Sequence, residues 1–585
     1  MKVSLIGAEL EENLGLRYMA AALEKAGHQA DIIPFATECE ISEVVRLVLR
    51  DQPDIAGLSM VFTGRGREFC RLAQALREAG YRGHVIGGGH FASFNCERLL
   101  RDYPAFDSIA LGEGEELICA LAAGLGHLDR IPALCYRRPD GSIATNPSEG
   151  NPDDLDALPF PKRTTFHAYF DKPIASVLTS RGCWRDCAFC SINAWYQRGG
   201  GRKFRIRSIE NIVAEMKELY FGHGVRIFNF QDDNFFLPNP VKAEQRFQEL
   251  RSRLAGAGIG PIAIAVKARP DSINYGSIRV LDQLGLFRVF LGVENASENG
   301  LRHLNRKSCL AEILNALDVL NGFGVHIAYN LLMFEPDTTL DDILVNLRFM
   351  ERHIENPFNF CRAEAYAGTG LEAALTAEGK LLGDYFGFDY RIKDPRCEAF
   401  HQVANYAFFN RNFSDYGLHY FNMQVDFYFQ LLRRFHPEAL TQSLRAAVRN
   451  FIKLTNLDTY ECICRIYDFV AAADPSDQVR LRAFAGELRE RVDERSTELL
   501  SRGERILHWL ESAYARRKSG PVEIPDLPVY TARGFAPPRE SQGAGRMNPF
   551  DPLGLTPVPI PYEVFKARLS RDPGERCEQP VSGTS

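Results

Sequence analysis

The residues best suited to chemistry lie in one short run, Ser180-Arg181-Gly182-Cys183-Trp184-Arg185-Asp186-Cys187-Ala188-Phe189-Cys190. Its three cysteines have the spacing C-x3-C-x2-C, which lets all three sulfurs face one small object. A zinc site commonly takes four ligands, often as two separated pairs, whereas each iron of a four-iron cluster needs a thiolate or a substitute. Three thiolates therefore leave one iron open, and a molecule with an amino group and a carboxylate could chelate it. With 14 cysteines in 585 residues, this spacing argues against a chance grouping of buried thiols.

The length and composition predict a globular protein of several domains. A chain of 585 residues is too long for one hydrophobic core, so we expect two to four domains. The formal net charge of -6 argues against nucleic-acid binding as the main activity. No uninterrupted apolar run reaches the roughly 18 residues that a membrane span needs. The first residues show no signal-peptide pattern and the cysteines are mostly scattered singly, so we expect a reducing, cytoplasmic setting.

Apolar strands alternate with helices over residues 1–140. This alternation predicts a doubly wound, Rossmann-like parallel sheet, whose ligands bind at the carboxyl ends of the strands. Glycines stand at those ends, where Gly87-Gly88-Gly89 leaves room for a bulky ligand to approach the backbone. The absence of G-x-G-x-x-G after the first strand makes a nucleotide ligand a weak interpretation, and each glycine alone also fits an ordinary tight turn. The expected strands are 3–8, 30–34, 54–60, 84–90 and 106–111, and the expected helices are 14–26, 41–50, 68–79 and one that opens near 115.

These features together resemble the cobalamin-binding domain that precedes many radical-SAM modules. The matching segments are Leu14-Gly15-Leu16-Arg17-Tyr18, Gly57-Leu58-Ser59, Gly87-Gly88-Gly89-His90 and Gly112-Glu113-Gly114-Glu115. The resemblance implies that cobalamin is contacted by Ser59, Thr63, Arg65, Gly87, Gly88, Gly89, Gly112 and Glu113. The loop of residues 9–13 lacks the histidine of the D-x-H-x-x-G pattern, so a protein histidine from that loop should not hold the lower face of the cobalt. Residues 61–65 are the candidate for that face, and His90 is a rival that also fits a nucleotide-tail pocket or a turn cap.

The central part of the chain predicts a partial (β/α)6 barrel over residues 174–382, after a linker at 141–173 that is rich in Pro, Asp and Asn. The first expected strand, 174–179, leads into the cysteine run. The strands that follow end in polar residues, and parallel barrels carry their sites at these ends. Asp232 and Asp233 could receive the ammonium of an amino-acid ligand, and Arg269 could pair with its carboxylate. Glu294 could accept hydrogen bonds from ribose hydroxyls, although each residue alone also fits a solvated loop charge.

This arrangement resembles the radical-SAM superfamily over roughly residues 175–370. The C-x3-C-x2-C loop is the signature of that superfamily, with Phe189 at the aromatic position beside the last cysteine. Asp232-Asp233-Asn234-Phe235 resembles its amino-group motif, and residues 292–297 resemble G-x-E-S-G-S with Asn and Ala replacing Ser and Gly. The turn at 334–339 resembles G-x-P-G-E-T but lacks both Gly and Glu, and residues 366–369 match a late G-T turn. The resemblance implies a [4Fe–4S] cluster on Cys183, Cys187 and Cys190, and S-adenosylmethionine contacts from Phe189, Asp232, Asp233, Arg269, Glu294 and Ser297.

The two resemblances together imply a cobalamin-dependent radical SAM enzyme. The commonest reaction of that class is methylation of an unactivated carbon, through a 5′-deoxyadenosyl radical and methylcobalamin. We expect a small-molecule or natural-product substrate and an external one-electron reductant of the flavodoxin or ferredoxin type. An oxidative cyclase or rearrangement enzyme without methyl transfer is the first alternative. A corrinoid or iron–sulfur sensor without turnover is the second, and a zinc protein is the weakest.

The carboxyl-terminal part of the chain changes character after about residue 383. Helical periodicity predicts a mainly helical domain over 383–518, with helices at 423–435, 439–454, 460–473 and 477–514. In the resembling family such a region commonly closes over the substrate. Cys462 and Cys464 are too closely spaced for a second cluster, so we expect buried thiols. Residues 519–585 are rich in Pro and Gly, so we expect an extended or partly disordered tail in which Cys577 is a free thiol.

Overall fold

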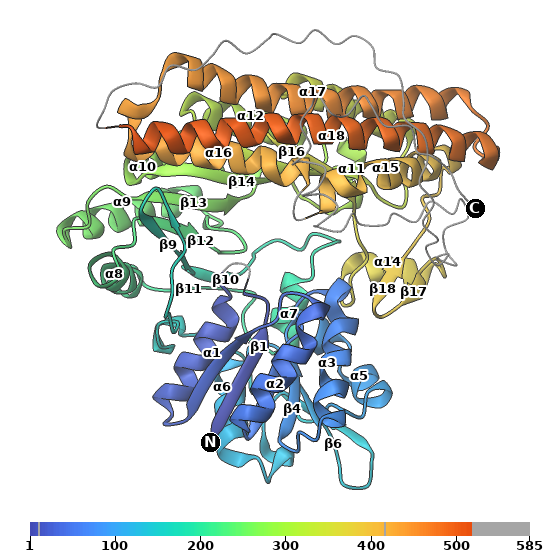
Figure 1. Ribbon diagram of the computed structural model, residues 1–585. Coiled ribbons are helices and arrows are strands. Elements are labelled where there is room, and N and C mark those ends of the chain that lie inside the picture. The colour runs from blue at the N-terminus through green and yellow to red at the C-terminus, as the bar shows by residue number, and fades with distance from the viewer. Residues whose placement is uncertain (10–11, 415–416, 518–585) are drawn as a thin grey trace, which may run out of the picture. The chain divides into compact units, whose positions relative to one another are not determined.

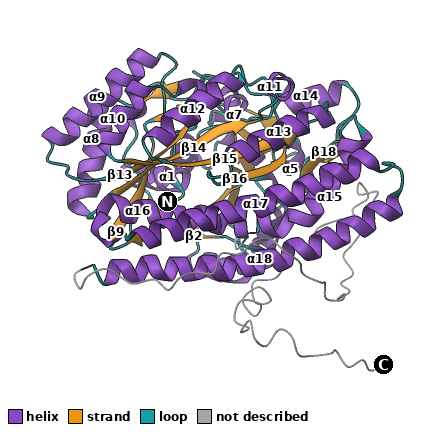
Figure 2. Ribbon diagram, turned by 90° about the horizontal axis from the view of Figure 1, so that it is seen from above, coloured by secondary structure: helices purple, strands orange, loops and turns teal. Residues whose placement is uncertain are grey.

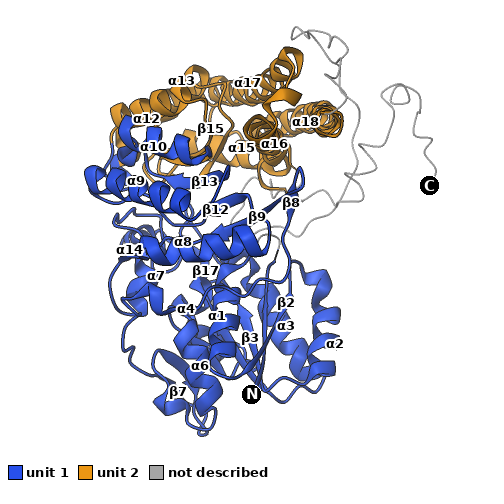
Figure 3. Cartoon of the chain, turned by 90° about the vertical axis from the view of Figure 1, so that its left-hand side faces the viewer, with its two compact units in different colours: residues 1–286, 302–308, 364–390 blue, residues 287–301, 309–363, 391–585 orange. Residues whose placement is uncertain are grey.

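The computed structural model describes residues 1–9, 12–414 and 417–517. The expected tail at 519–585 and Cys577 lie outside the described residues. The described chain divides into two compact units (Figure 3). Unit 1 holds residues 1–286, 302–308 and 364–390, and unit 2 holds residues 287–301, 309–363 and the chain from 391 onward.

The first domain of unit 1 is built on a seven-stranded sheet with the order β2-β1-β3-β4-β5-β6-β7 (Figure 1). Its first five strands are parallel, as the alternation of strands and helices predicts. The last two run antiparallel and were not expected, because they are only four and three residues long and too short to show a clear pattern. The strands are β1 (Lys2–Gly7), β2 (Gln29–Pro34), β3 (Ile55–Ser59), β4 (His84–Gly88), β5 (Ser108–Ala110), β6 (Leu134–Arg137) and β7 (Ile143–Thr145).

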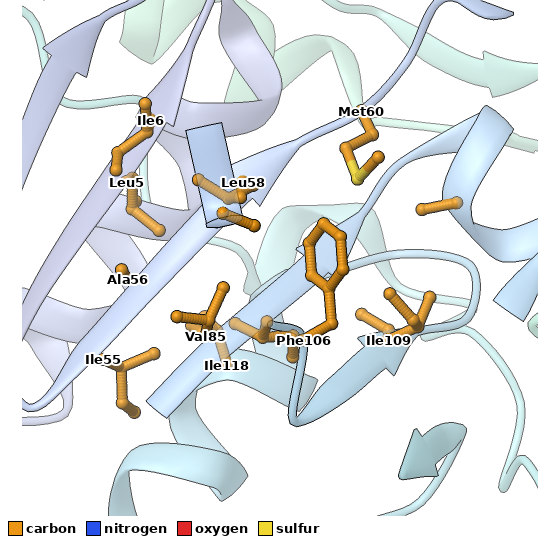
Figure 4. Close-up of a cluster of buried hydrophobic side chains, with 14 of the residues drawn as sticks. Leu5, Ile6, Ile55, Ala56, Leu58, Met60, Val85, Phe106, Ile109 and Ile118 are labelled. Carbon is orange, nitrogen blue, oxygen red and sulfur yellow. The ribbon is translucent and has the colours of Figure 1, made fainter. Parts of the chain in front are cut away.

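Apolar side chains on both faces of this sheet form the core of the first domain. Leu5, Ile55, Val85, Phe106 and Ile109 are almost fully buried in it (Figure 4). Such two-sided burial is expected of parallel strands that are covered by helices on both faces. The covering helices are α1 (Leu14–Lys25), α2 (Ile41–Asp51), α3 (Gly66–Glu78), the short α4 (His90–Phe94) and α5 (Cys96–Asp102), and α6 (Glu115–Gly124).

The remainder of unit 1 contains three more parallel strands, β9 (Lys172–Val177), β12 (Ile227–Phe230) and β13 (Ala263–Ala268). The helix that begins at Ile209 has a side-chain cap, because the Ser208 hydroxyl accepts from the backbone N–H of Asn211 at 3.1 Å. The cysteine run itself begins in a hairpin that the sequence did not reveal, in which β10 (Ser180–Gly182) pairs antiparallel with β11 (Phe204–Ile206). The helices of this region are α7 (Ile192–Arg198), α8 (Ile209–Lys217), α9 (Pro240–Gly256), α10 (Tyr275–Leu284) and α14 (Gly370–Ala377).

Unit 2 continues the alternation with the parallel strands β14 (Leu286–Glu294, whose first residue belongs to unit 1), β15 (His326–Phe334) and β16 (Phe358–Arg362). The helices α12 (Leu310–Gly322) and α13 (Leu340–Arg352) follow the first two of these strands. A register shift between β14 and β15 falls at the end of β14, where Glu294 adopts a positive φ of 64°. Glu294 therefore stands at an irregular strand end, as functional residues often do.

Four long helices complete unit 2, namely α15 (Pro395–Phe413), α16 (Leu418–Phe435), α17 (Gln442–Ala472) and α18 (Gln478–Ala515) (Figure 2). Cys462 on α17 is buried, as predicted, whereas Cys464 is only half-buried because it lies further around the helix. Within the described residues, no helix combines the length and the apolar character that crossing a membrane requires.

The prediction of two helices at 439–454 and 460–473 is wrong, because α17 is continuous. Polar residues at its middle resemble a loop in the sequence, but tertiary partners satisfy them. Asp458 pairs with the buried Arg411 at 2.8 Å, and the Asn456 amide donates to the carbonyl of Ile354 at 2.7 Å. Contacts with distant parts of unit 2 therefore keep this stretch helical.

We predict that Gly89→Ala destabilises the first domain. Gly89 has φ 95° and ψ -179°, a conformation that is nearly restricted to glycine, and an added Cβ would lie 3.1 Å from the carbonyl carbon and oxygen of Met60. The expected cost is about 1–3 kcal/mol of unfolding free energy, measured by chemical denaturation. Gly88→Ala is the matched control, because its Cβ would meet only the Ala110 Cβ at 3.6 Å. Equal stabilities of the two variants would contradict the prediction.

Candidate functional site

The strand end that leads into the cysteine run is held by one buried carboxylate. Asp232 is fully buried and accepts from the Thr179 backbone N–H at 3.1 Å, the Thr179 hydroxyl at 2.8 Å and the Ser180 hydroxyl. Burial raises the pKa of Asp232, and these donors act in the opposite direction. Because three groups of the chain already use this carboxylate, its geometry suits positioning the loop better than binding an ammonium, and its predicted contact with S-adenosylmethionine stays a prediction.

The three cysteines lie together in a loop that backbone hydrogen bonds fasten on both sides. The Ala188 N–H donates to the Leu304 carbonyl at 2.9 Å, and the Leu371 N–H donates to the Ala188 carbonyl at 2.8 Å. Cys187 is buried, whereas Cys183 and Cys190 are half-buried. Burial raises the pKa of Cys190 to about 12, and the neighbouring thiols of Cys187 and Cys183 act in the same direction. Three thiols in one short loop fit a metal cluster, which binds them as thiolates and displaces their protons.

Asp233 differs from its neighbour in having a carboxylate that the chain uses only in part. Its Oδ2 accepts from the backbone N–H of Gly182, directly before the first cysteine, at 3.1 Å. Burial raises the pKa of Asp233 to about 6. An ammonium group beside the cysteine loop would stabilise the ionised form. Of the two consecutive aspartates, Asp233 is therefore the one whose surroundings favour the predicted ammonium contact.

The other residues predicted to contact S-adenosylmethionine have different surroundings. Arg269 follows β13, but its guanidinium is directed at Asp271, at 2.9 Å, and at the Cys187 sulfur, at 3.3 Å. Phe189 has the Arg306 guanidinium 6.0 Å from its ring centre. In unit 2, the Ser297 hydroxyl donates to Asp342, while its backbone N–H donates to the Asn295 side chain at 2.9 Å. The assignments of Arg269, Phe189, Glu294 and Ser297 to this cofactor stay predictions.

A cavity of about 260 Å³ lies at the carboxyl ends of the strands in the first domain. The predicted residues that line it are Ser59, Gly87, Gly88, Gly89, Gly112 and Glu113. Thr63 and Arg65 are absent from its lining, and Arg65 donates to Glu68 at 2.8 Å and to the Phe35 carbonyl at 3.0 Å. Gly112 has φ 77°, and an added Cβ would meet the Gly199 Cα at 2.7 Å. A wall of backbone and glycines fits a broad, flat ligand.

The same cavity is lined by residues that flank the cysteine run, and most of them carry no signal in the sequence. Leu178 and Arg181 precede the first cysteine, and Trp195 and Tyr196 belong to the helix that follows the third. The cavity of the first domain therefore borders the cysteine loop. Of these residues, only Arg181 could have been identified from the sequence, because a cation two residues before Cys183 complements the acidic Gly112-Glu113-Gly114-Glu115 turn.

Buried ion pairs join this turn to the cysteine region. Arg181 pairs with Glu115 at 2.6 Å and with Glu113 at 3.2 Å, and Arg205 also pairs with Glu113. Arg181 lies 5.1 Å from the ring centre of Tyr18, whose pKa burial raises to about 12. The Glu113 carboxylate thus serves as an intramolecular partner, and only its position in the cavity lining supports the predicted contact with cobalamin.

His90 forms a second link between the first domain and the cysteine region. Its ring stacks on Trp195 with a centroid distance of 4.3 Å, and the Trp195 indole N–H donates to the Ser93 hydroxyl at 3.2 Å. Burial lowers the pKa of His90 to about 4, so the imidazole is neutral at physiological pH. Its Nε2 is buried and has no hydrogen-bond partner among the described residues. A polar atom of this kind at a cavity wall fits a ligand that completes its hydrogen bonding.

Two family models match the chain in the regions that hold these features. The B12 binding domain model matches residues 8–122, which include the glycine-lined strand ends. The radical SAM superfamily model matches residues 177–350, which include the cysteine loop. The chain thus carries a B12-binding domain followed by a radical SAM domain, and the predicted fold class is confirmed.

Curated relatives match more than half of the chain. An uncharacterized methyltransferase, PH0819, of Pyrococcus horikoshii is 26% identical over 380 residues, which are 63% of this chain and 79% of that protein. The hopanoid C-3 methylase of Methylococcus capsulatus is 29% identical over 56% of this chain and 61% of its own length. The anaerobic magnesium-protoporphyrin IX monomethyl ester cyclase of Synechocystis is 27% identical over 53% of this chain and 62% of its own length. The chain therefore spans about three-fifths of the length of the last two relatives.

Solved structures show the same fold. The cobalamin-dependent S-adenosylmethionine radical enzyme OxsB, with aqua-cobalamin and S-adenosylmethionine bound, matches with a TM-score of 0.63 and 16% identity over 88% of this chain and 83% of that chain. The radical S-adenosylmethionine methyltransferase TsrM of Kitasatospora setae matches with a TM-score of 0.55 and 16% identity over 65% of this chain and 78% of that chain. The chain thus combines a B12-binding domain with a radical SAM domain in the fold of these enzymes, and the two domains imply cobalamin, S-adenosylmethionine and a [4Fe–4S] cluster as cofactors.

We predict that S-adenosylmethionine binding weakens as the pH falls through the pKa of Asp233. That pKa is raised to about 6, so the carboxylate is ionised above this pH and must lose a proton to accept an ammonium below it. The dissociation constant should rise by up to about tenfold per pH unit below 6, as measured by anaerobic calorimetry on reconstituted protein.

Two substitutions make this prediction specific. Asp233→Asn should lose affinity and its pH dependence together. Asp186→Asn is the control in the same loop, because Lys203 and Asn193 bond that carboxylate and hold its pKa below the usual range. An unchanged pH profile in Asp233→Asn would contradict the assignment.

We predict that His90→Ala weakens the binding of hydroxocobalamin. Losing one hydrogen bond to a neutral imidazole should raise the dissociation constant by about two- to tenfold, measured from the absorbance of the bound corrinoid. Nitrogen splitting in the electron paramagnetic resonance spectrum of bound cob(II)alamin would show whether Nε2 reaches the cobalt. His84→Ala is the control, because His84 begins the strand that precedes His90 but bonds Ser108 at 2.7 Å. Equal corrinoid affinity of His90→Ala and the unaltered protein would refute the prediction.

Proposed function

We propose that this protein methylates an unactivated carbon of a small-molecule or natural-product substrate. In this proposal residues 1–140 bind the corrinoid, and residues 174–382 bind the cluster and S-adenosylmethionine. An external reductant of the flavodoxin or ferredoxin type supplies the electron.

One observation carries the proposal. The glycine-lined cavity of the B12-binding domain is walled on another side by Arg181, Trp195 and Tyr196, which flank the cluster cysteines. A corrinoid in this cavity would therefore lie beside the cluster loop, as methyl transfer to a substrate radical requires. The methyltransferase names of PH0819, of the hopanoid C-3 methylase and of TsrM support the same reaction.

Cys183, Cys187 and Cys190 would hold the cluster, which would supply the electron that converts S-adenosylmethionine to methionine and a 5′-deoxyadenosyl radical, and the first domain would hold methylcobalamin as the source of the methyl group. The chain itself holds and shields these groups. Asp232 positions the strand end before the cysteines, and Asp233 receives the ammonium of S-adenosylmethionine. Tyr18, Trp195 and Tyr196 line the cavity with large rings, which exclude water from a site where a radical must survive.

Oxidative cyclisation or rearrangement without methyl transfer is the second candidate. The cyclase of Synechocystis and the 4'-phospho-dehydrooxetanocin synthase of Priestia megaterium, which is 25% identical over 55% of this chain, favour it. A non-catalytic corrinoid or iron–sulfur sensor is the third. Product mass separates the two enzymes, because methylation adds one methyl group whereas oxidation removes hydrogens.

We predict that the protein, reconstituted anaerobically with iron, sulfide and cobalamin, forms 5′-deoxyadenosine from S-adenosylmethionine under reducing conditions. Cys187→Ala should lose the iron–sulfur absorbance and all 5′-deoxyadenosine formation, because one of three ligands is missing. Cys39→Ala is the matched control, since Cys39 is exposed and lies outside the loop. Chromatography and mass spectrometry measure both nucleoside and product.

The outcomes discriminate among the candidates. Turnover that persists in Cys187→Ala would refute the cluster assignment. Protein that takes up no corrinoid would remove the first-domain assignment, and a loaded protein that forms no 5′-deoxyadenosine would favour the sensor.

A further inference from the structure

Two buried guanidinium groups converge on the sulfur of Cys187. Arg269 Nη1 lies 3.3 Å from this sulfur, and Arg306 Nη1 lies 3.2 Å from it. The two arginines are only 6% and 4% exposed, and Cys187 is 9% exposed. Both contacts have the length of N–H···S hydrogen bonds, and both donors carry a full positive charge.

A chain of hydrogen bonds fixes both arginines in place. Asp271 accepts from Arg269 Nε at 2.9 Å and from Arg185 Nη2 at 2.8 Å. Arg269 Nη2 donates to the backbone carbonyl of Arg306, so the two arginines are bonded to each other. A contact that is held from two sides, with little solvent access, is pre-organised rather than incidental.

The other two cysteines have weaker donors. The backbone N–H groups of Arg185 and Ile192 bond Cys183 and Cys190, respectively. Both donors are neutral peptide groups. Among the described residues, Cys187 is therefore the cluster cysteine that has guanidinium hydrogen-bond donors.

We propose that Arg269 and Arg306 are positioning residues that donate N–H···S hydrogen bonds to the cluster ligand Cys187 and raise the reduction potential of the cluster. Reduction adds one electron, whose charge spreads onto the ligating sulfurs, and charged donors stabilise that state more than the oxidised one. The carboxylate contact that the sequence predicts for Arg269 stays a prediction beside this role. The proposal rests on the proposed function only in requiring a cluster on the three cysteines.

The test measures the midpoint potential of the reconstituted cluster, without substrate or cobalamin, by redox titration followed with electron paramagnetic resonance. In Arg306→Met, which loses both charge and donor, the ratio of reduced to oxidised cluster at a fixed potential should fall about tenfold, since a hydrogen bond to a charged group contributes on that scale. A tenfold change corresponds to about 59 mV for a one-electron couple. Arg306→Lys, which keeps the charge, should recover part of the loss.

Lys203→Ala is the matched charge control. Lys203 is a cation beside the loop, bonded to Asp186 at 2.8 Å, but its side chain is 42% exposed, and its removal should leave the potential unchanged. Equal potentials in Arg306→Met and the unaltered protein, with full iron and sulfide content, would overturn the proposal. Loss of the cluster from both Arg306→Met and Arg306→Gln in folded protein would overturn it too, because the arginine would then hold the loop. Failure of methyl transfer affects none of these readouts.

Discussion

The buried ion pairs of Arg181 with Glu113 and Glu115 are the contact on which the candidate site depends. They connect the acidic turn of the B12-binding domain to the strand that enters the cluster loop, and they line the cavity where the two meet. Burying a charge is costly unless it is paired and hydrogen-bonded, so breaking such a pair typically costs about 3–5 kcal/mol. The two carboxylates pair with two arginines, so each buried charge in this region has a partner of opposite charge. The relative placement of the corrinoid site and the cysteine loop within unit 1 is thereby coupled to a specific set of side chains.

The same balance of buried charge recurs around the cysteines. A cluster with three thiolate ligands brings negative charge into a largely buried loop, and Arg269 and Arg306 provide positive charge at one sulfur. Asp271 pairs with Arg269 and Arg185, so it offsets part of the positive charge and orients the two guanidinium groups. The two consecutive aspartates beside the loop have different contacts. Asp232 accepts hydrogen bonds from the residues that lead into the loop, whereas the carboxylate of Asp233 remains suited to an incoming ammonium.

Much of the fold followed from pattern alone. Strands and helices of the B12-binding and radical SAM regions have strong periodicity and clear caps, such as Ser208, so local preference and tertiary packing agree there. The continuous α17 was missed because Asn456 and Asp458 appear polar enough for a loop until Ile354 and Arg411 provide their partners. The antiparallel strands β6 and β7 and the β10–β11 hairpin were missed because strands this short carry too little periodicity to be recognised.

The chemistry could be inferred from the amino-acid order, because C-x3-C-x2-C spacing needs only a short loop to bring three sulfurs together. The place of the glycines could be inferred too, since strand ends in a parallel sheet follow from the alternation of elements. Only the tertiary structure shows which polar side chains already have partners within the chain and which are still able to bind a ligand. Arg269 and Glu113 are predicted from the sequence to contact ligands. The fold adds partners that the sequence did not indicate, namely Asp271 and Cys187 for Arg269 and Arg181 and Arg205 for Glu113. Apart from Asp271, these partners lie far away in the chain, so local spacing cannot reveal them. His90 and Trp195 likewise meet only because two domains pack together within unit 1.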